Sequence, residues 1–101
     1  MARRQERISH FVEVTLESSS GKQQARMSDL SLGGCFIDSI ADVPKGEKIA
    51  FEIVRPGEAP LRFSGTVVYT LPGMGFGVEF TELNDEQKTY LEAKALPIHV
   101  T

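Results

Sequence analysis

Apolar and polar residues alternate through most of the chain, and this alternation restricts the fold more than any other feature of the sequence. In FVEVTLE, residues 11–17, Val12, Val14 and Leu16 fall on one face, with Glu and Thr residues between them. Successive side chains of a β-strand point to opposite faces, so a period of two is typical of a strand buried on one side. This run is therefore predicted to be a strand with one face in a core.

Five further runs have the same strand-like character. With the first, they cover residues 11–17, 23–31, 35–40 (ending near Asp38), 48–54, 61–70 and 74–80. Turn-forming stretches separate the runs: SSSGK, ADVPKGE, RPGEAP and LPG. Short strands at such even spacing predict an all-β barrel or sandwich.

The apolar positions of these runs give the expected core. Those expected to face inward are Ile49, Phe51 and Ile53, then Leu61, Phe63, Val67 and Tyr69, then Met74, Phe76, Val78 and Phe80, together with Phe36. Gly73, Gly75 and Gly77 form a G-x-G-x-G pattern, but apolar residues alternate with them. A phosphate-binding loop would instead open a helix, so strand packing is the better interpretation.

The period changes near the C-terminus. Asn84 is a suitable N-cap and Gln87 occupies the capping-box position three residues later. A helix is therefore predicted over about 84–95, with Tyr90 and Leu91 packed on the β-structure and Pro97 beyond its end.

Composition bounds the class of protein. At 101 residues, with 41% hydrophobic and 25% charged residues, the chain suits one globular domain. No apolar run is long enough to span a bilayer and no signal peptide is recognisable, so we expect a cytoplasmic protein without membrane insertion. Cys35 is the sole cysteine, which excludes an intramolecular disulfide and, with only two histidines, argues against zinc. We expect no metal and no cofactor.

Charge is distributed unevenly. Residues 1–26 carry five basic and three acidic side chains, whereas the remainder has a net charge of −5. So acidic a surface is a poor partner for DNA or RNA. A small anion held by the first arginines remains compatible with it.

The first candidate site is RRQER, which contains Arg3, Arg4 and Arg7. Guanidinium groups bind phosphates bidentately and stack on flat bases. Three of them within five residues would make a compact anion site if the segment folded over a ligand. The alternative is a solvated basic N-terminus, which is common.

The second candidate site is DLSLGG, in which Asp29, Ser31 and Gly34 form a D-x-S-x-x-G pattern. A carboxylate matches two adjacent donors on a guanine edge, and Ser31 can donate or accept. Gly33 and Gly34 remove side chains where backbone must approach a ligand or bend sharply. The alternative is a bulge or tight turn whose Asp and Ser bond to local backbone.

An R-x-x-x-R followed about twenty residues later by D-x-S-x-x-G, within a six-run β-pattern and a terminal helix, resembles a PilZ domain. GFGVEF followed by TELNDEQKTYLEA is also similar to the end of that family's barrel and its closing helix. The resemblance covers about residues 3–95. It implies a six-stranded antiparallel β-barrel, the PilZ-like split barrel, with a C-terminal α-helix.

The resemblance also implies a receptor for the bacterial second messenger cyclic di-GMP, and no enzyme. Arg3 and Arg7 match the arginines that hold its phosphates and guanines, while Asp29, Ser31 and Gly34 match the motif that holds a guanine on the barrel. Arg4 and Gly33 are expected as weaker contacts. We expect a flexible arm over residues 1–9 that closes on the ligand, a barrel and helix over 10–95, and a tail over 96–101.

With two residues before Arg3, the chain is expected to act as a stand-alone adaptor that changes a surface read by a downstream protein. Two other classes remain open. One is an interaction module of the same fold that acts without nucleotide on motility, pilus or chemotaxis machinery. The other is a barrel for single-stranded nucleic acid, which the acidic remainder disfavours. An enzyme is the least supported class, because Cys35 and Ser31 lack the sequence context of an activated nucleophile.

Overall fold

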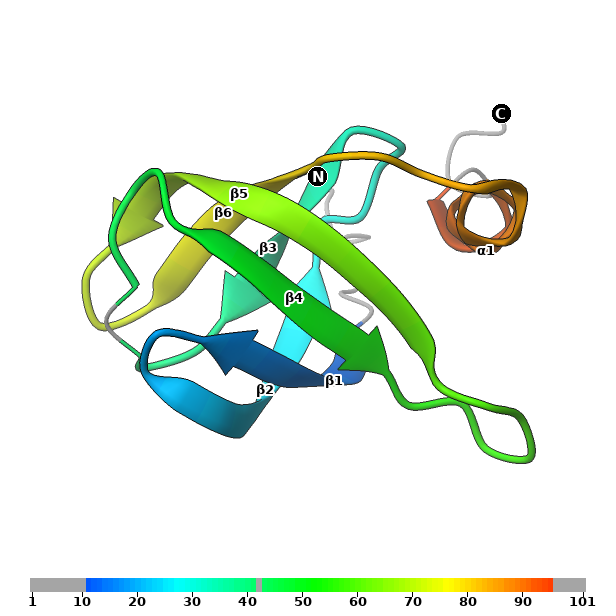
Figure 1. Ribbon diagram of the computed structural model, residues 1–101, viewed down its shortest axis with the longest axis horizontal. Helices are drawn as coiled ribbons and strands as arrows, with labels where there is room; N and C mark the ends of the chain where they lie inside the picture. Colours follow the sequence, from blue (N-terminus) through cyan, green and yellow to red (C-terminus); the bar gives the residue numbers. More distant parts are fainter. Residues whose placement is uncertain (1–10, 42, 96–101) are drawn as a thin grey trace, which may run out of the picture.

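The computed structural model describes residues 11–41 and 43–95, which form a closed antiparallel β-barrel with one helix beside it (Figure 1). The strands are β1 (Val12–Ser18), β2 (Gly21–Ser28), β3 (Gly34–Asp38), β4 (Lys48–Ile53), β5 (Leu61–Leu71) and β6 (Gly75–Phe80), followed by α1 (Asp85–Ala95). Neighbours around the barrel follow the order β1-β2-β3-β6-β5-β4, and β4 pairs with β1 to close it. The predicted six-stranded antiparallel barrel with a C-terminal helix is confirmed.

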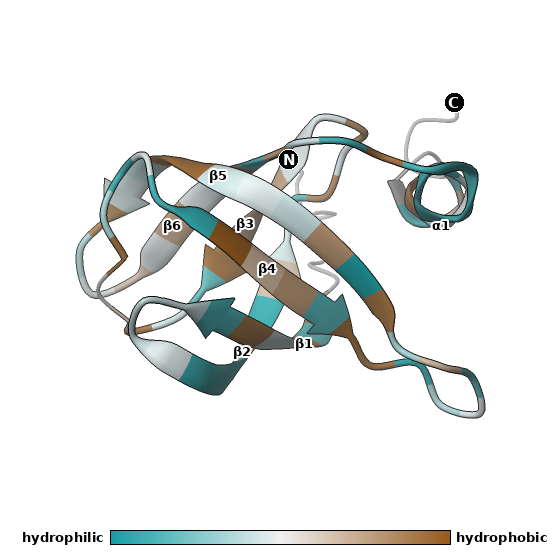
Figure 2. Cartoon of the chain, in the orientation of Figure 1, coloured by the Kyte–Doolittle hydropathy of each residue, from teal (hydrophilic) through white to brown (hydrophobic). Residues whose placement is uncertain are grey.

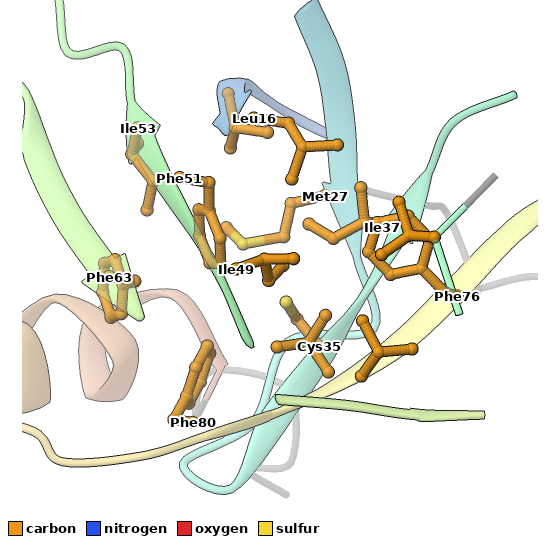
Figure 3. Packing of buried hydrophobic residues seen from close by; sticks show 14 of the residues in the cluster. Leu16, Met27, Cys35, Ile37, Ile49, Phe51, Ile53, Phe63, Phe76 and Phe80 are labelled. Carbon is orange, nitrogen blue, oxygen red and sulfur yellow. The ribbon is translucent and has the colours of Figure 1, made fainter. Parts of the chain in front are cut away.

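The core lies inside the barrel and is built from the alternating apolar positions (Figure 3). Its largest side chains are aromatic. The rings of Phe51 and Phe63 stack 5.5 Å apart, and Phe80 lies 5.3 Å from Phe63. Closure leaves no unpaired edge, so each strand can bury its apolar face against the others.

Two residues expected in the core, Tyr69 and Met74, lie outside it. The pairing of β5 with β6 shifts between Val67 and Tyr69, which is a β-bulge at Val68. Because one extra residue reverses the alternation, Tyr69 points outward and is 49% exposed. Met74 is 60% exposed because it belongs to the turn before β6, where its N–H donates to the carbonyl of Leu71.

The prediction that Phe36 belongs to the core is also wrong. Phe36 is half-buried on the outer face of β3, where it pairs with Gly77 and its ring lies 6.3 Å from that of Tyr69. A Cβ at Gly75 would strike the ring of Phe36, and one at Gly77 would strike that of Tyr69. The absence of side chains at the two glycines therefore leaves the space that these two aromatic rings occupy on the outer face.

Helix α1 is joined to the barrel by its N-terminal turn. The side chains of Asn84 and Gln87 each accept a hydrogen bond from the other's backbone N–H, at 2.8 and 2.6 Å, which is the predicted capping box. Gln87 also donates to the carbonyl of Arg62, and Leu91 is fully buried. The rest of the helix surface is mostly hydrophilic (Figure 2). Within the described ranges, no helix is both long and apolar enough to cross a membrane.

Candidate functional site

The DLSLGG segment is the loop between β2 and β3. Strand β2 ends at Ser28, so the expected strand over 23–31 is three residues too long. Asp29 has a φ of 52°, the left-handed region that Asp tolerates better than most residues. This conformation turns the backbone out of the β2 ladder, while Leu30 packs against the core and holds the loop to the barrel.

The hydroxyl of Ser31 organises this loop. It accepts hydrogen bonds from the N–H groups of Gly33 and Gly34, both at 3.2 Å, and donates to the Gly34 carbonyl at 3.2 Å. The same carbonyl accepts the Ser31 N–H at 2.9 Å. A hydroxyl offers one donor and two acceptor sites, so all of them are used within the loop.

The two glycines of the loop differ in what surrounds them. Gly34 pairs with Glu79 of β6, and a Cβ there would overlap the carbonyl oxygen of Val78. At Gly33 the nearest atom to a built Cβ would be the Ser31 hydroxyl oxygen, 3.9 Å away. Gly34 is therefore required by the close approach of β3 to β6, whereas at Gly33 a Cβ would meet only ordinary van der Waals contact with the Ser31 hydroxyl.

The carboxylate of Asp29 takes no part in the hydrogen bonds within the loop. Asp29 is exposed, and no other described residue forms a hydrogen bond or ion pair with its side chain. The neighbouring Leu32 is also 49% exposed. The loop thus presents an acceptor pair at Asp29 and an exposed glycine, Gly33, whose carbonyl accepts a hydrogen bond from the N–H of Phe80 at 2.9 Å.

The N-terminal arm joins the barrel next to this loop. Val12, the first residue of β1, pairs with Met27, so Phe11 comes level with Ser28 and one residue from Asp29. Arg3, Arg4 and Arg7 lie outside the described residues. An extended chain spans at most about 3.5 Å per residue, so four residues allow Arg7 to reach about 14 Å from Phe11.

Two residues at this junction, Phe11 and Arg26, were not singled out from the sequence as part of a site. The Arg26 guanidinium lies over the Phe11 ring, 4.7 Å from its centroid. The sequence contained one signal that could have identified Arg26 as part of the site. Alternation in β2 indicates that its side chain faces outward, three residues before Asp29. Only the register of β1 on β2 brings the two side chains together.

Other candidate chemistry receives little support. Burial, with a smaller contribution from the Asp29 carboxylate, raises the pKa of the Cys35 thiol to about 12, so the thiol stays protonated near neutral pH. The described part of the chain holds no cluster of three or more His, Cys, Asp or Glu side chains suited to a metal. Two open hollows, one between β1, β4 and β5 and one between Arg55 and α1, lie away from the loop. Among the described residues, neither hollow is lined by a residue of the DLSLGG loop.

The role of Ser31 can be tested in the protein without ligand. Ser31→Ala should lower the free energy of unfolding by about 1 kcal/mol, since it removes the hydroxyl that holds two backbone N–H groups. Amide hydrogen exchange at Gly33 and Gly34 should become faster. Ser31→Thr retains the hydroxyl and should retain most of the protection. Unchanged exchange in Ser31→Ala would show that the hydroxyl does not order the loop.

Comparison with known proteins agrees with this fold. The family described as the PilZ domain matches residues 2–95. Among solved structures, the PilZ domain of CeSA from a cellulose-synthesizing bacterium superposes with a TM-score of 0.63 at 19% sequence identity, covering 90% of this chain and 95% of that one. The comparison with curated proteins gave no match. Because the family match spans nearly the whole chain, this protein belongs to the PilZ domain family, a family of cyclic di-GMP-binding modules that are generally not enzymes.

Proposed function

We propose that this chain is a non-enzymatic receptor for cyclic di-GMP, held between the arginines of the N-terminal arm and the DLSLGG loop. The observation that carries the proposal is the register of β1 on β2. Val12 pairs with Met27, so β1 begins beside the end of β2, where the DLSLGG loop starts. Two motifs separated by about twenty residues can therefore act on one ligand.

The chemistry of the two halves is complementary to the ligand. Cyclic di-GMP carries two phosphates and two purine bases. Arg3 and Arg7, with Arg4 between them, supply cations that bind phosphate bidentately and stack on bases. Asp29 supplies the acceptor pair for the N1–H and N2–H₂ donors of a guanine. Gly33 is exposed and has no Cβ, which would let that base approach the loop backbone.

Ligand binding would act as a switch through the arm. Residues 1–9 contain little apolar surface with which to fold alone, so we expect the ligand to order them, at a cost in binding free energy. The ordered arm would then change the charge and shape of the surface beside β2. We propose that a downstream protein reads this change.

Calorimetric titration tests the proposal. Cyclic di-GMP should bind saturably, whereas GTP and cyclic di-AMP should bind weakly or not at all. Arg7→Ala and Asp29→Ala should each weaken binding about 10- to 100-fold, because each removes charge-assisted hydrogen bonds worth about 1.5–3 kcal/mol. Lys88→Ala makes the same change of charge as Arg7→Ala, and Glu92→Ala the same change as Asp29→Ala, but both lie on the exposed surface of α1. These two control variants should bind cyclic di-GMP as the unmodified protein does.

Absence of heat and of chemical-shift changes at high ligand concentration would contradict the receptor function. The interaction module that acts without nucleotide would then be the better candidate. One observation favours it: the outer surface carries large apolar side chains, with Ile40 88% and Leu71 42% exposed. Such residues are compatible with contact to another protein.

A further inference from the structure

We propose that Phe11, Arg26 and Asp38 form an anchor that holds the root of the N-terminal arm beside the DLSLGG loop. The inference rests on the proposed function and assigns these three residues to positioning the arm. None of them belongs to either motif. Their contacts are made between residues of the protein itself, so the anchor can be examined separately from binding.

The first part of the anchor is the contact between Phe11 and Arg26. Phe11 is the residue through which the arm joins β1, and its ring is 49% exposed on the outer surface instead of entering the core. The Arg26 guanidinium covers it at 4.7 Å, within the range of a cation–π contact. An exposed ring that adds nothing to the core is thus fixed by a side chain of the neighbouring strand.

The second part is the contact that holds Arg26 itself. The Nη2 atom of Arg26 donates to Oδ2 of Asp38 at 3.3 Å, and Asp38 lies opposite Arg26 on β3. The planar guanidinium can bond a carboxylate along its edge while presenting its face to a ring. Two neighbouring strands, β2 and β3, therefore contribute one residue each, and the contacts run from β3 through β2 to Phe11, directly before β1.

The position of this anchor explains why it would matter for the ligand. Phe11 comes level with Ser28, the last residue of β2, and Asp29 follows directly. Fixing Phe11 sets where the arm starts and limits the volume that Arg7, four residues earlier, can explore. A smaller volume raises the effective concentration of the arm's arginines at the loop and lowers the entropic cost of closing on a ligand.

The size of the effect follows from the contact. Exposed cation–π contacts have modest strength, corresponding to about a two- to fivefold change in an equilibrium constant. We therefore expect Phe11→Ala and Arg26→Ala each to weaken cyclic di-GMP binding about two- to fivefold. Because both remove the same contact, the double variant should lose little more than either single variant.

A measurement without ligand tests the anchor directly. A nitroxide attached to Gln5→Cys should broaden the amide signals of Gly33 and Gly34, and labelling will be selective because Cys35 is buried with a raised thiol pKa. The broadening should fall in Phe11→Ala and Arg26→Ala. Lys22→Ala, on the same strand and exposed to solvent, is the matched control and should leave it unchanged.

Conservative variants separate the anchor from a general charge effect. Arg26→Lys keeps a cation but loses the planar group that bonds Asp38 along its edge while its face covers the ring, so it should lie between the unmodified protein and Arg26→Ala in both measurements. Phe11→Tyr keeps a ring and should behave like the unmodified protein. Thermal unfolding should change little in all these variants, since neither side chain fills the core.

The outcomes for the anchor and for the receptor function are distinguishable. Unchanged broadening and unchanged affinity in Phe11→Ala and Arg26→Ala would overturn the anchor while leaving the receptor function standing. Failure of the unmodified protein to bind cyclic di-GMP would overturn the receptor function, but the broadening would still report on the anchor. If affinity falls while broadening stays the same, Arg26 acts on the ligand itself and the positioning role is wrong.

Discussion

Gly34→Ala is expected to lower the free energy of unfolding by about 3 kcal/mol, a loss at the upper end of those caused by overpacking. The added Cβ would overlap the Val78 carbonyl oxygen and lie 3.1 Å from the carbonyl carbon and 3.3 Å from Cα of Glu79. These are backbone atoms of the neighbouring strand, so no rotamer change relieves the contact. The pairing of β3 with β6 must open instead. Urea unfolding measures the loss.

Gly33→Ala is the matched control for this prediction. The same methyl group is added one residue earlier, where the nearest atom lies 3.9 Å away, and stability should change by less than about 0.5 kcal/mol. If Gly34→Ala and Gly33→Ala were equally stable, the close approach of β3 to β6 would not be the reason for a glycine at position 34. Gly33→Ala should still weaken cyclic di-GMP binding, because its methyl group stands where we place the base. The two glycines would then be separated into a packing role and a ligand role.

Phe63→Ala should destabilise the barrel by about 4 kcal/mol, as large-to-small changes of buried aromatic residues do. Its side chain is 1% exposed and lies at the centre of an aromatic cluster, 5.5 Å from Phe51, 5.3 Å from Phe80 and 6.3 Å from Tyr90. The last contact joins the barrel to α1. A domain of this size has only about 5–15 kcal/mol of stability, so the variant should show a much lower melting temperature by circular dichroism.

Phe36→Ala removes the same side chain from the outer face. There the ring covers Gly75 and faces Tyr69, and its loss should cost about 1 kcal/mol. A loss as large as that of Phe63→Ala would mean that the outer aromatic pair is part of the core in energetic terms. A difference of about 3 kcal/mol between the variants would confirm the assignment of faces.

The alternation of apolar and polar residues was sufficient to predict the strands, because a strand with one buried face places every second side chain in the core. It failed at Tyr69, where the bulge at Val68 reverses which face each residue occupies. Nothing in LRFSGTVVYT marks this bulge, since it depends on how β5 fits against β6. Phe36 was misplaced for a related reason: the glycines that accommodate its ring belong to another strand.

For the candidate site, the sequence identified the residue types that suit the ligand, but it did not show how the fold brings them together. Asp29 and the arginines stood out as residue types that suit phosphates and guanine edges. The sequence left open whether Ser31 and Gly34 meet a ligand or shape a turn. The structure gives both a role within the fold, in the loop's hydrogen bonds and in the approach of β3 to β6.

What the sequence by itself determined is the set of strands, the capped helix and the two motifs, since periodicity, capping and residue chemistry are local properties. The order of those motifs along the chain resembles a PilZ domain, and the family match over residues 2–95 confirms that resemblance. The tertiary structure alone decided that β1 begins beside the end of β2 and that Arg26 of β2 covers Phe11, the residue directly before β1. The physical reason is that register comes from packing six strands around one core, a condition that no single segment contains.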